Sequence, residues 1–258
     1  MATSPLSDRL ERALAITDNA ARISLSHFRS PLAVEEKPDR SPVTIADRET
    51  ETAIRAALAE HFPGETIFGE EFGLSGAGAD MWIIDPIDGT RSFLTGLPLF
   101  GMLLGYLADG RPDLGVIRMP ALGEVYSGAR GLGATMNGVP IAVSAVRRLA
   151  DARLFINEGD KIAAAAPDIF ARLTGAGNLR RLAADCYPHA LVAAGRADAV
   201  VDFGLEPYDY LPVAAVVEAA GGIMTDWAGA ALTMTSDGRT LTAATPELHA
   251  DLLDLVNA

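Results

Sequence analysis

Two aspartates, Asp85 and Asp88, lie three positions apart in the stretch WIIDPIDGTRSF, residues 82–93. Pro86 stands between them, and Asp85 follows an apolar run that is typical of a buried strand. Either aspartate could simply cap a turn that the proline and Gly89 shape. An unpaired carboxylate at the end of a buried strand, however, costs several kcal/mol unless a partner compensates it. A divalent cation such as Mg²⁺ is a suitable partner, because it takes oxygen ligands and keeps several waters.

The residues after the aspartates provide groups that bind an anion. Residues 89–92, GTRS, are expected to begin a helix whose free N–H groups point at an anion. The carbonyl of Ile87, exposed in such a turn, is a further candidate metal ligand. Metal ligands beside a phosphate-binding helix start are the layout of metal-assisted phosphoryl transfer.

Two further acidic features are candidate partners of this pair. Glu70 and Glu71 follow a short strand predicted for residues 65–69, and Asp209 opens a helix that is apolar over 211–217. Each also has an ordinary explanation, since tandem glutamates suit a solvated turn and an aspartate suits an N-cap. All the histidines lie outside these stretches: His27, His61, His189 and His249. An all-oxygen Mg²⁺ site is therefore favoured over zinc.

Two glycine clusters match a dinucleotide-binding fingerprint only in part. GARGLGATMNG carries Gly131 and Gly133 but has Met136 at the third position, and the cluster at 76–81 ends in Met81 in the same way. Neither clearly opens a helix after a strand, so both argue against nucleotide binding through these loops.

The helices and strands that must position the acids are predicted from the spacing of apolar residues and from capping and turn residues. A helix is predicted from Ser4–Pro5 to about Leu25, and a second opens near Thr44, with Asp47 three positions on, and stops at Pro63–Gly64. Residues 73–80 read as a small-residue loop. Short apolar runs separated by turn residues predict an antiparallel meander over 100–143.

The second half of the chain has a different pattern. Candidate strands (152–156, 178–182, 197–203 and 222–226) alternate with candidate helices (168–174, 187–195, 209–220 and 246–257). We therefore expect an N-terminal α+β half, residues 1–143, packed closely against a C-terminal α/β half, residues 144–258.

Composition limits the classes of function. A net charge of −13 over 258 residues, without a basic stripe, argues against a nucleic-acid partner. The longest apolar runs, 99–108 and 211–220, are too short and interrupted to cross a bilayer. The acidic N-terminal turns lack a signal core, so we expect an unprocessed chain, and the single cysteine, Cys186, suits a reducing cytoplasm.

Four motifs together resemble the inositol monophosphatase superfamily of Mg²⁺-dependent, lithium-sensitive phosphatases. They are SPVTIADRETE (41–51), FGEEFG (68–73), WIIDPIDGTRSF (82–93) and PYDYLPVAAVVEAAGG (207–222). The match runs in the right order from about residue 41 to residue 226. The resemblance implies an α/β fold built as a layered α-β-α-β-α sandwich, and a homodimer.

The resemblance also implies a metal-ligand set. One Mg²⁺ would be held by Glu70, Asp85 and the Ile87 carbonyl. A second would be held by Asp85, Asp88 and Asp209, with Glu70 able to help a third. The expected cofactor is therefore two to three Mg²⁺ ions, for which Mn²⁺ could substitute.

Catalytic roles are carried over in the same way. Thr90, paired with Asp47, would activate the attacking water, with Glu71 assisting. The backbone N–H groups of Gly89 and Thr90 would bind the phosphate. The expected partner is thus a small phosphorylated alcohol.

Within the superfamily, the chain is most similar to the histidinol-phosphate phosphatases. Inositol monophosphatases usually read W-D-x-A-A-G late in the chain, whereas this one has PYDYLPVA, and RSF follows Thr90 where T-N-F is common. The histidinol-phosphate branch has an aspartate at the position of Asp185 and P-Y-D at 207–209. It often has glycines before that aspartate, whereas this chain has alanines at 183 and 184, which could reshape the pocket.

Charge gives an independent argument for that substrate. L-Histidinol phosphate carries an ammonium and a protonatable imidazole, which would suit a pocket lined by Asp185, Asp202 and Glu206. Arg91 and Asp209 complete the expected substrate contacts. Neutral inositol needs hydroxyl partners instead.

Three alternatives stay open. The acids around Asp185 could be solvated charges at the rim of the site. The same chemistry could act on inositol 1-phosphate or on a broad set of sugar and nucleotide monophosphates. A non-catalytic protein on this fold is a third reading, although every implied ligand and the Thr90–Asp47 pair are present.

Overall fold

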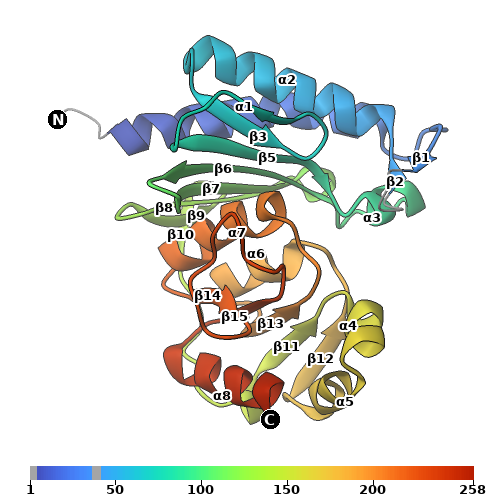
Figure 1. Cartoon of the computed structure of the whole chain (residues 1–258), viewed down its shortest axis with the longest axis vertical. Helices are drawn as coiled ribbons and strands as arrows, with labels where there is room; N and C mark the ends of the chain where they lie inside the picture. Colours follow the sequence, from blue (N-terminus) through green and yellow to red (C-terminus); the bar gives the residue numbers. More distant parts are fainter. Residues whose placement is uncertain (1–4, 37–41) are drawn as a thin grey trace.

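The computed structural model describes residues 5–36 and 42–258, and their elements stack as layers in the order α-β-α-β-α (Figure 1). Two helices cover one face of a large sheet, two more separate it from a smaller sheet, and helices cover the far face of the smaller sheet (Figure 1). This architecture confirms the layered α/β sandwich predicted from the sequence.

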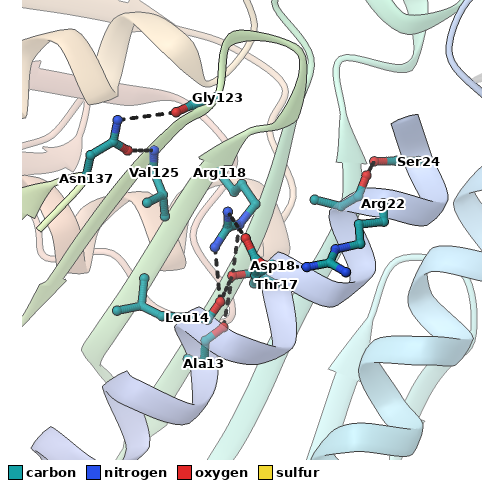
Figure 2. A network of polar contacts seen from close by, with 11 residues as sticks. Ala13, Leu14, Thr17, Asp18, Arg22, Ser24, Arg118, Gly123, Val125 and Asn137 are labelled. Atoms are coloured by element: carbon teal, nitrogen blue, oxygen red, sulfur yellow. Dashed lines mark hydrogen bonds and ion pairs between the residues drawn. The ribbon is translucent and has the colours of Figure 1, made fainter. Parts of the chain in front are cut away.

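The outer layer consists of α1 (Pro5–His27) and α2 (Ile45–His61). Thr44 and Asp47 form the expected capping box of α2, in which Asp47 accepts from the N–H and the hydroxyl of Thr44. Ser4, the predicted start of α1, lies outside the described residues. Arg118 fixes α1 to the large sheet, because its guanidinium binds Asp18 at 3.0 Å and the Leu14 carbonyl at 3.0 Å (Figure 2).

The large sheet has the strand order β10-β9-β8-β7-β6-β5-β3-β4. Its strands are β3 (Thr66–Gly69), β4 (Gly73–Ser75), β5 (Met81–Asp88), β6 (Gly101–Ala108), β7 (Arg111–Met119), β8 (Glu124–Ala129), β9 (Gly133–Met136) and β10 (Val139–Ile141). Successive strands from β6 to β10 pair antiparallel, which confirms the predicted meander. The loop predicted for 73–80 is wrong in its first three residues, because these pair with β3 as the edge strand β4.

The middle layer is formed by α6 (Tyr187–Ala193) and α7 (Pro207–Ala219). Nearly all of α7 is buried, because it contacts β6, β7 and β8 on one side and the smaller sheet on the other. This position explains why its sequence is apolar on every face, as the run 211–217 indicated.

The smaller sheet has the order β12-β11-β13-β15-β14 and is mixed. It comprises β11 (Arg153–Ile156), β12 (Leu179–Leu182), β13 (Ala199–Asp202), β14 (Ile223–Asp226) and β15 (Thr240–Ala243), with α4 (Gly159–Ala165), α5 (Pro167–Gly175) and α8 (Pro246–Asn257) beside it. The strands and helices predicted after residue 150 all occur, whereas α4 and β15 were not predicted. The large sheet ends before residue 143 and the smaller one starts after it, while the division into two halves stays a prediction.

Short elements complete the chain: β1 (Glu35–Glu36), β2 (Pro42–Val43), α3 (Thr90–Thr95) and the 3₁₀ turns η1 (Pro120–Leu122) and η2 (Leu149–Asp151). Within the residues that the structure describes, none of the helices combines the length and the apolarity that crossing a membrane requires.

Candidate active site

The strand β5 carries both aspartates of the opening motif. Its pairing with β6 shifts register between Asp85 and Asp88, so the strand bulges where Pro86 removes a backbone donor. Asp85 is 2% exposed, and its Oδ1 accepts from the N–H of Ile87 at 3.0 Å. The Ile87 carbonyl accepts from the Thr90 hydroxyl at 3.2 Å. The bulge therefore turns two carboxylates and one carbonyl toward the same region.

Asp209 joins this pair from α7. One carboxylate oxygen from each of Asp85, Asp88 and Asp209 lies within 4.8 Å of the others. Asp209 is the third residue of α7, and its Oδ2 accepts from the N–H of Glu206 at 2.7 Å. Glu206, not Asp209, is the N-cap residue, so the ordinary N-cap explanation for Asp209 is wrong.

Burial and mutual repulsion perturb all three acids. Burial raises the pKa of Asp85 well above its usual range, and the charges of Glu70, Asp88 and Asp209 raise it further. Burial, followed by the charge of Asp88, also raises the pKa of Asp209 well above its usual range. Burial raises the pKa of Asp88 to about 7, and the charge of Asp185 acts in the same direction. Like charges therefore crowd together at this end of the site, and their repulsion opposes ionisation of all three carboxyls at once.

Three other sequence-predicted acids belong to the turn after β3 and to α2. Glu70 lies just after β3 and lines the same cavity as the aspartates, and its N–H bonds to the Ile84 carbonyl at 3.1 Å. Glu71 is half-buried in the turn that follows. Asp47 is fully buried in α2, where its Oδ2 accepts from the Thr44 hydroxyl at 2.6 Å. The pairing of Asp47 with Thr90 stays a prediction.

The start of α3 is positioned by a glycine. Gly89 is the N-cap residue of α3 and has φ +80°, in the left-handed region that favours glycine. A Cβ at this position would lie 2.5 Å from Cγ of Asp185, so only a glycine lets that aspartate approach. Arg91, the next predicted contact, is largely exposed, with its guanidinium 3.9 Å from Glu158.

The loop that carries Asp185 is held by several side chains that sequence analysis missed. Asp185 has φ +51°, and its Oδ2 accepts from the Ser92 hydroxyl at 2.5 Å. Its carbonyl accepts from Nδ2 of Asn157 at 2.8 Å. The N–H of Cys186 donates to Oδ2 of Asp88 at 2.7 Å, which ties the loop to the aspartate cluster.

Asp202 is buried beside this loop. Its Oδ2 accepts from Nδ2 of Asn157 at 2.8 Å and lies 3.1 Å from Nε2 of His189, while its Oδ1 accepts from the N–H of Phe203. His189 Nδ1 lies 2.8 Å from the Thr242 hydroxyl, so both ring nitrogens have partners. His189 thus lines the cavity and is held there by Asp202 and Thr242.

A cavity of about 230 Å³ brings these groups together. Most of the predicted site residues line it: Glu70, Asp85, Ile87, Asp88, Gly89, Thr90, Arg91, Asp185, Asp202 and Asp209. Residues not predicted also line it, among them Asn157, Glu158, Lys161, His189 and Tyr208. Asp185 lines the cavity beside α3 and the aspartate cluster, since it accepts from Ser92 and approaches Gly89. Asp202 and Glu158 line the same cavity, and Glu158 pairs with Lys161 at 2.6 Å.

Comparison with known proteins identifies the family of this chain. A family model described as the inositol monophosphatase family matches residues 6–258. The chain belongs to the inositol monophosphatase family. The histidinol-phosphatase of Chlorobaculum parvum is 41% identical over 223 residues, covering 85% of this chain and 86% of that protein. The histidinol-phosphatase of Mycobacterium tuberculosis is 34% identical and covers 97% of this chain and 98% of its own length.

A solved structure extends the similarity to the whole fold. The inositol monophosphatase of Zymomonas mobilis superposes with a TM-score of 0.90 at 35% identity, covering 99% of this chain and 100% of that one. Membership of the inositol monophosphatase family makes this protein a phosphatase, and the cavity with its aspartates is the candidate place for that reaction.

The aspartate cluster fits a divalent cation. Three carboxylates lie within 4.8 Å of one another, and their pKa values are raised by burial and by neighbouring negative charge. Among the described ion pairs, none joins Asp85, Asp88 or Asp209 to a lysine, an arginine or a histidine. A hard cation with oxygen ligands would supply the missing positive charge.

Proposed function

We propose that this protein is a Mg²⁺-dependent phosphatase that hydrolyses L-histidinol phosphate. The observation that carries the substrate assignment is the pair of acids Asp185 and Asp202, which line the cavity beside the aspartate cluster. A substrate with an ammonium and a protonatable imidazole would find negative charge there. The names of the relatives from Chlorobaculum parvum and Mycobacterium tuberculosis support the same substrate.

Five groups would hold the metal in this proposal: the carboxylates of Glu70, Asp85, Asp88 and Asp209 and the carbonyl of Ile87. When bound, Mg²⁺ supplies positive charge that offsets the carboxylates and phosphoryl oxygens and lowers the pKa of a coordinated water. Two to three ions, with Mn²⁺ as a substitute, remain the expectation from the family resemblance.

The protein's own groups have distinct roles in the reaction. The N–H groups of Gly89 and Thr90 bind the phosphate at the start of α3. The Thr90 hydroxyl donates to the Ile87 carbonyl in this structure, and in the reaction it would turn to Asp47 as its acceptor and, with Glu71 assisting, orient the water in line with the phosphate ester. Asp185 pairs with the cationic alcohol and so aligns the ester for attack.

Hydrolysis of inositol 1-phosphate is the second candidate function. It is favoured by the close similarity to the Zymomonas mobilis inositol monophosphatase over nearly the whole chain. Both candidates use the same metal-binding residues and differ in the residues that would contact the alcohol. We also propose that the protein is a homodimer.

A substrate panel distinguishes these candidates. Phosphate release is measured from L-histidinol phosphate, inositol 1-phosphate, fructose 1,6-bisphosphate and 3′-phosphoadenosine 5′-phosphate, each with Mg²⁺ and with EDTA. The proposal expects the highest kcat/KM for L-histidinol phosphate, and release only with Mg²⁺. A higher kcat/KM for inositol 1-phosphate would show that inositol 1-phosphate, not L-histidinol phosphate, is the preferred substrate. Equal phosphate release in EDTA would contradict the proposed metal dependence.

A further inference from the structure

Glu51 is a buried carboxylate for which the proposed reaction has no role. It lies in α2, its side chain is fully buried, and it does not line the cavity. Its Oε2 accepts from the N–H of Glu71 at 2.7 Å, and its Oε1 lies 3.4 Å from the N–H of Phe72. Oε1 also accepts from Nε of Arg55 at 2.7 Å. Glu51 therefore binds the backbone of the turn that carries Glu70.

Arg55 holds the other side of the same turn. Asp47, Glu51 and Arg55 are spaced four residues apart, so they lie on one face of α2. The Arg55 guanidinium donates to the Gly73 carbonyl and to the Ser75 hydroxyl. The Glu51–Arg55 pair thus connects α2 to the turn after β3 and to the strand β4 that follows it.

The backbone before Glu70 packs directly against this pair. A Cβ added to Gly69 would lie 2.2 Å from Oε1 of Glu51, so no larger residue fits without displacing the carboxylate. On the other side, the N–H of Glu70 bonds to the Ile84 carbonyl of β5 at 3.1 Å. The backbone of Glu70 is therefore fixed between α2 and β5.

We propose that Glu51 is a positioning residue that holds Glu70 in place for metal binding. The inference rests on the proposed function, because it takes Glu70 as a metal ligand. Without the carboxylate, the N–H groups of Glu71 and Phe72 lose their buried acceptor, and the turn must be ordered again when the metal binds. The cost is a loss of metal affinity, as for other residues that orient metal ligands without touching the metal.

The test is a titration of Mn²⁺ binding, followed by electron paramagnetic resonance of the free ion. Glu51→Gln keeps the shape of the side chain, but in either orientation its amide NH₂ faces an N–H donor of Glu71 or Arg55. We expect its dissociation constant for Mn²⁺ to rise about 10- to 100-fold. Glu49→Gln is the matched control, because Glu49 lies on the same helix but is exposed and pairs with His27, and it should bind Mn²⁺ as the wild type does.

Gly69→Ala tests the same contact from the opposite side. Its methyl group should displace the Glu51 carboxylate and weaken Mn²⁺ binding by a similar factor. If Glu51→Gln does not fold, Gly69→Ala is the variant that tests the inference. A purely structural role would lower the melting temperature but leave the Mn²⁺ affinity of the folded protein unchanged.

The possible outcomes separate this inference from the proposed function. Wild-type Mn²⁺ affinity in a folded Glu51→Gln or Gly69→Ala protein would overturn the role of Glu51 alone. Absence of Mn²⁺ binding in the wild type would overturn both this inference and the metal dependence of the proposed function.

Discussion

The Ser92 hydroxyl donates a hydrogen bond of 2.5 Å to Oδ2 of Asp185, although 93 positions separate the two residues. Ser92 belongs to α3, which begins at the proposed phosphate site, and Asp185 lines the same cavity as a proposed contact of the alcohol. The bond therefore connects the part of the site that would bind phosphate with the part that would bind the alcohol. Loss of this bond should therefore affect both parts of the site.

Asp185→Asn tests the assignment of the alcohol side. The amide keeps an acceptor for Ser92 but removes the charge that would pair with a cationic substrate. We expect kcat/KM for L-histidinol phosphate to fall about 10- to 150-fold, which corresponds to the roughly 1.5–3 kcal/mol of a hydrogen bond to a charged group. The value for p-nitrophenyl phosphate should change little.

Asp254→Asn is the control for that change, because Asp254 is an exposed acid on α8. It should leave both substrates unaffected. An equal loss for the two substrates in Asp185→Asn would make Asp185 a structural residue.

Gly89→Ala tests the close approach between α3 and the Asp185 loop. The alanine is strained at φ +80°, and its Cβ would lie 2.5 Å from Cγ of Asp185. Gly123→Ala supplies the matched strain, since Gly123 has φ +66° and nothing lies within 4 Å of an added Cβ. Gly123→Ala should lose about 1–2 kcal/mol of unfolding free energy, measured by denaturant titration. Gly89→Ala should lose more, because its methyl group also clashes with Asp185.

Only Gly89→Ala should lose phosphatase activity, because only there does the methyl group move a substrate-binding residue. Similar kcat/KM values in the two variants would show that the approach of Asp185 to Gly89 has no effect on the reaction.

The raised pKa of Asp88 makes the metal-free protein sensitive to pH. Its pKa is about 7 in the folded state and near 3.9 in an unfolded chain, so the folded state binds the proton more tightly. The contribution of Asp88 to stability therefore falls as pH rises from about 4 to about 7, and stays low above that. Asp88→Asn removes this charge and should gain stability over the wild type as the pH rises.

Calorimetric melting temperatures in EDTA at pH 5 and pH 8 check this prediction. The increase in melting temperature of Asp88→Asn over the wild type should be larger at pH 8 than at pH 5. Each kcal/mol of unfolding free energy corresponds to about 2–4 °C in melting temperature. Saturating Mg²⁺ should reverse this increase at pH 8 by stabilising the wild type. The same difference in melting temperature at both pH values would contradict the raised pKa.

Local signals in the sequence predicted much of this structure. The capping box at Thr44 and Asp47 placed the start of α2 correctly, because it depends on residues only three positions apart. Turn residues between apolar runs likewise predicted the meander of β6 to β10. The cluster of Asp85, Asp88 and Asp209 was predicted through a family resemblance, since Asp209 is more than 100 residues away in the chain.

Sequence patterns could not predict contacts between segments that are distant in the chain. Asn157 and His189 have no motif of their own, and they reach Asp202 only because β11, α6 and β13 lie together in the fold. Glu51 was assigned no role of its own from the sequence, because its contacts depend on the turn after β3. Residues 73–75 read as a loop, because an edge strand rich in small residues has a weak pattern.

The most direct test of the account is the Mg²⁺ dependence of phosphate release from L-histidinol phosphate by the wild type and by Asp85→Asn. Asp85→Asn removes one of the three clustered carboxylates with little change in shape, and circular dichroism confirms that the variant is folded. We predict that the wild type releases phosphate only when Mg²⁺ is added, and that Asp85→Asn has no measurable turnover at any Mg²⁺ concentration. Release by the wild type in EDTA, or wild-type turnover by Asp85→Asn, would contradict the proposed metal site.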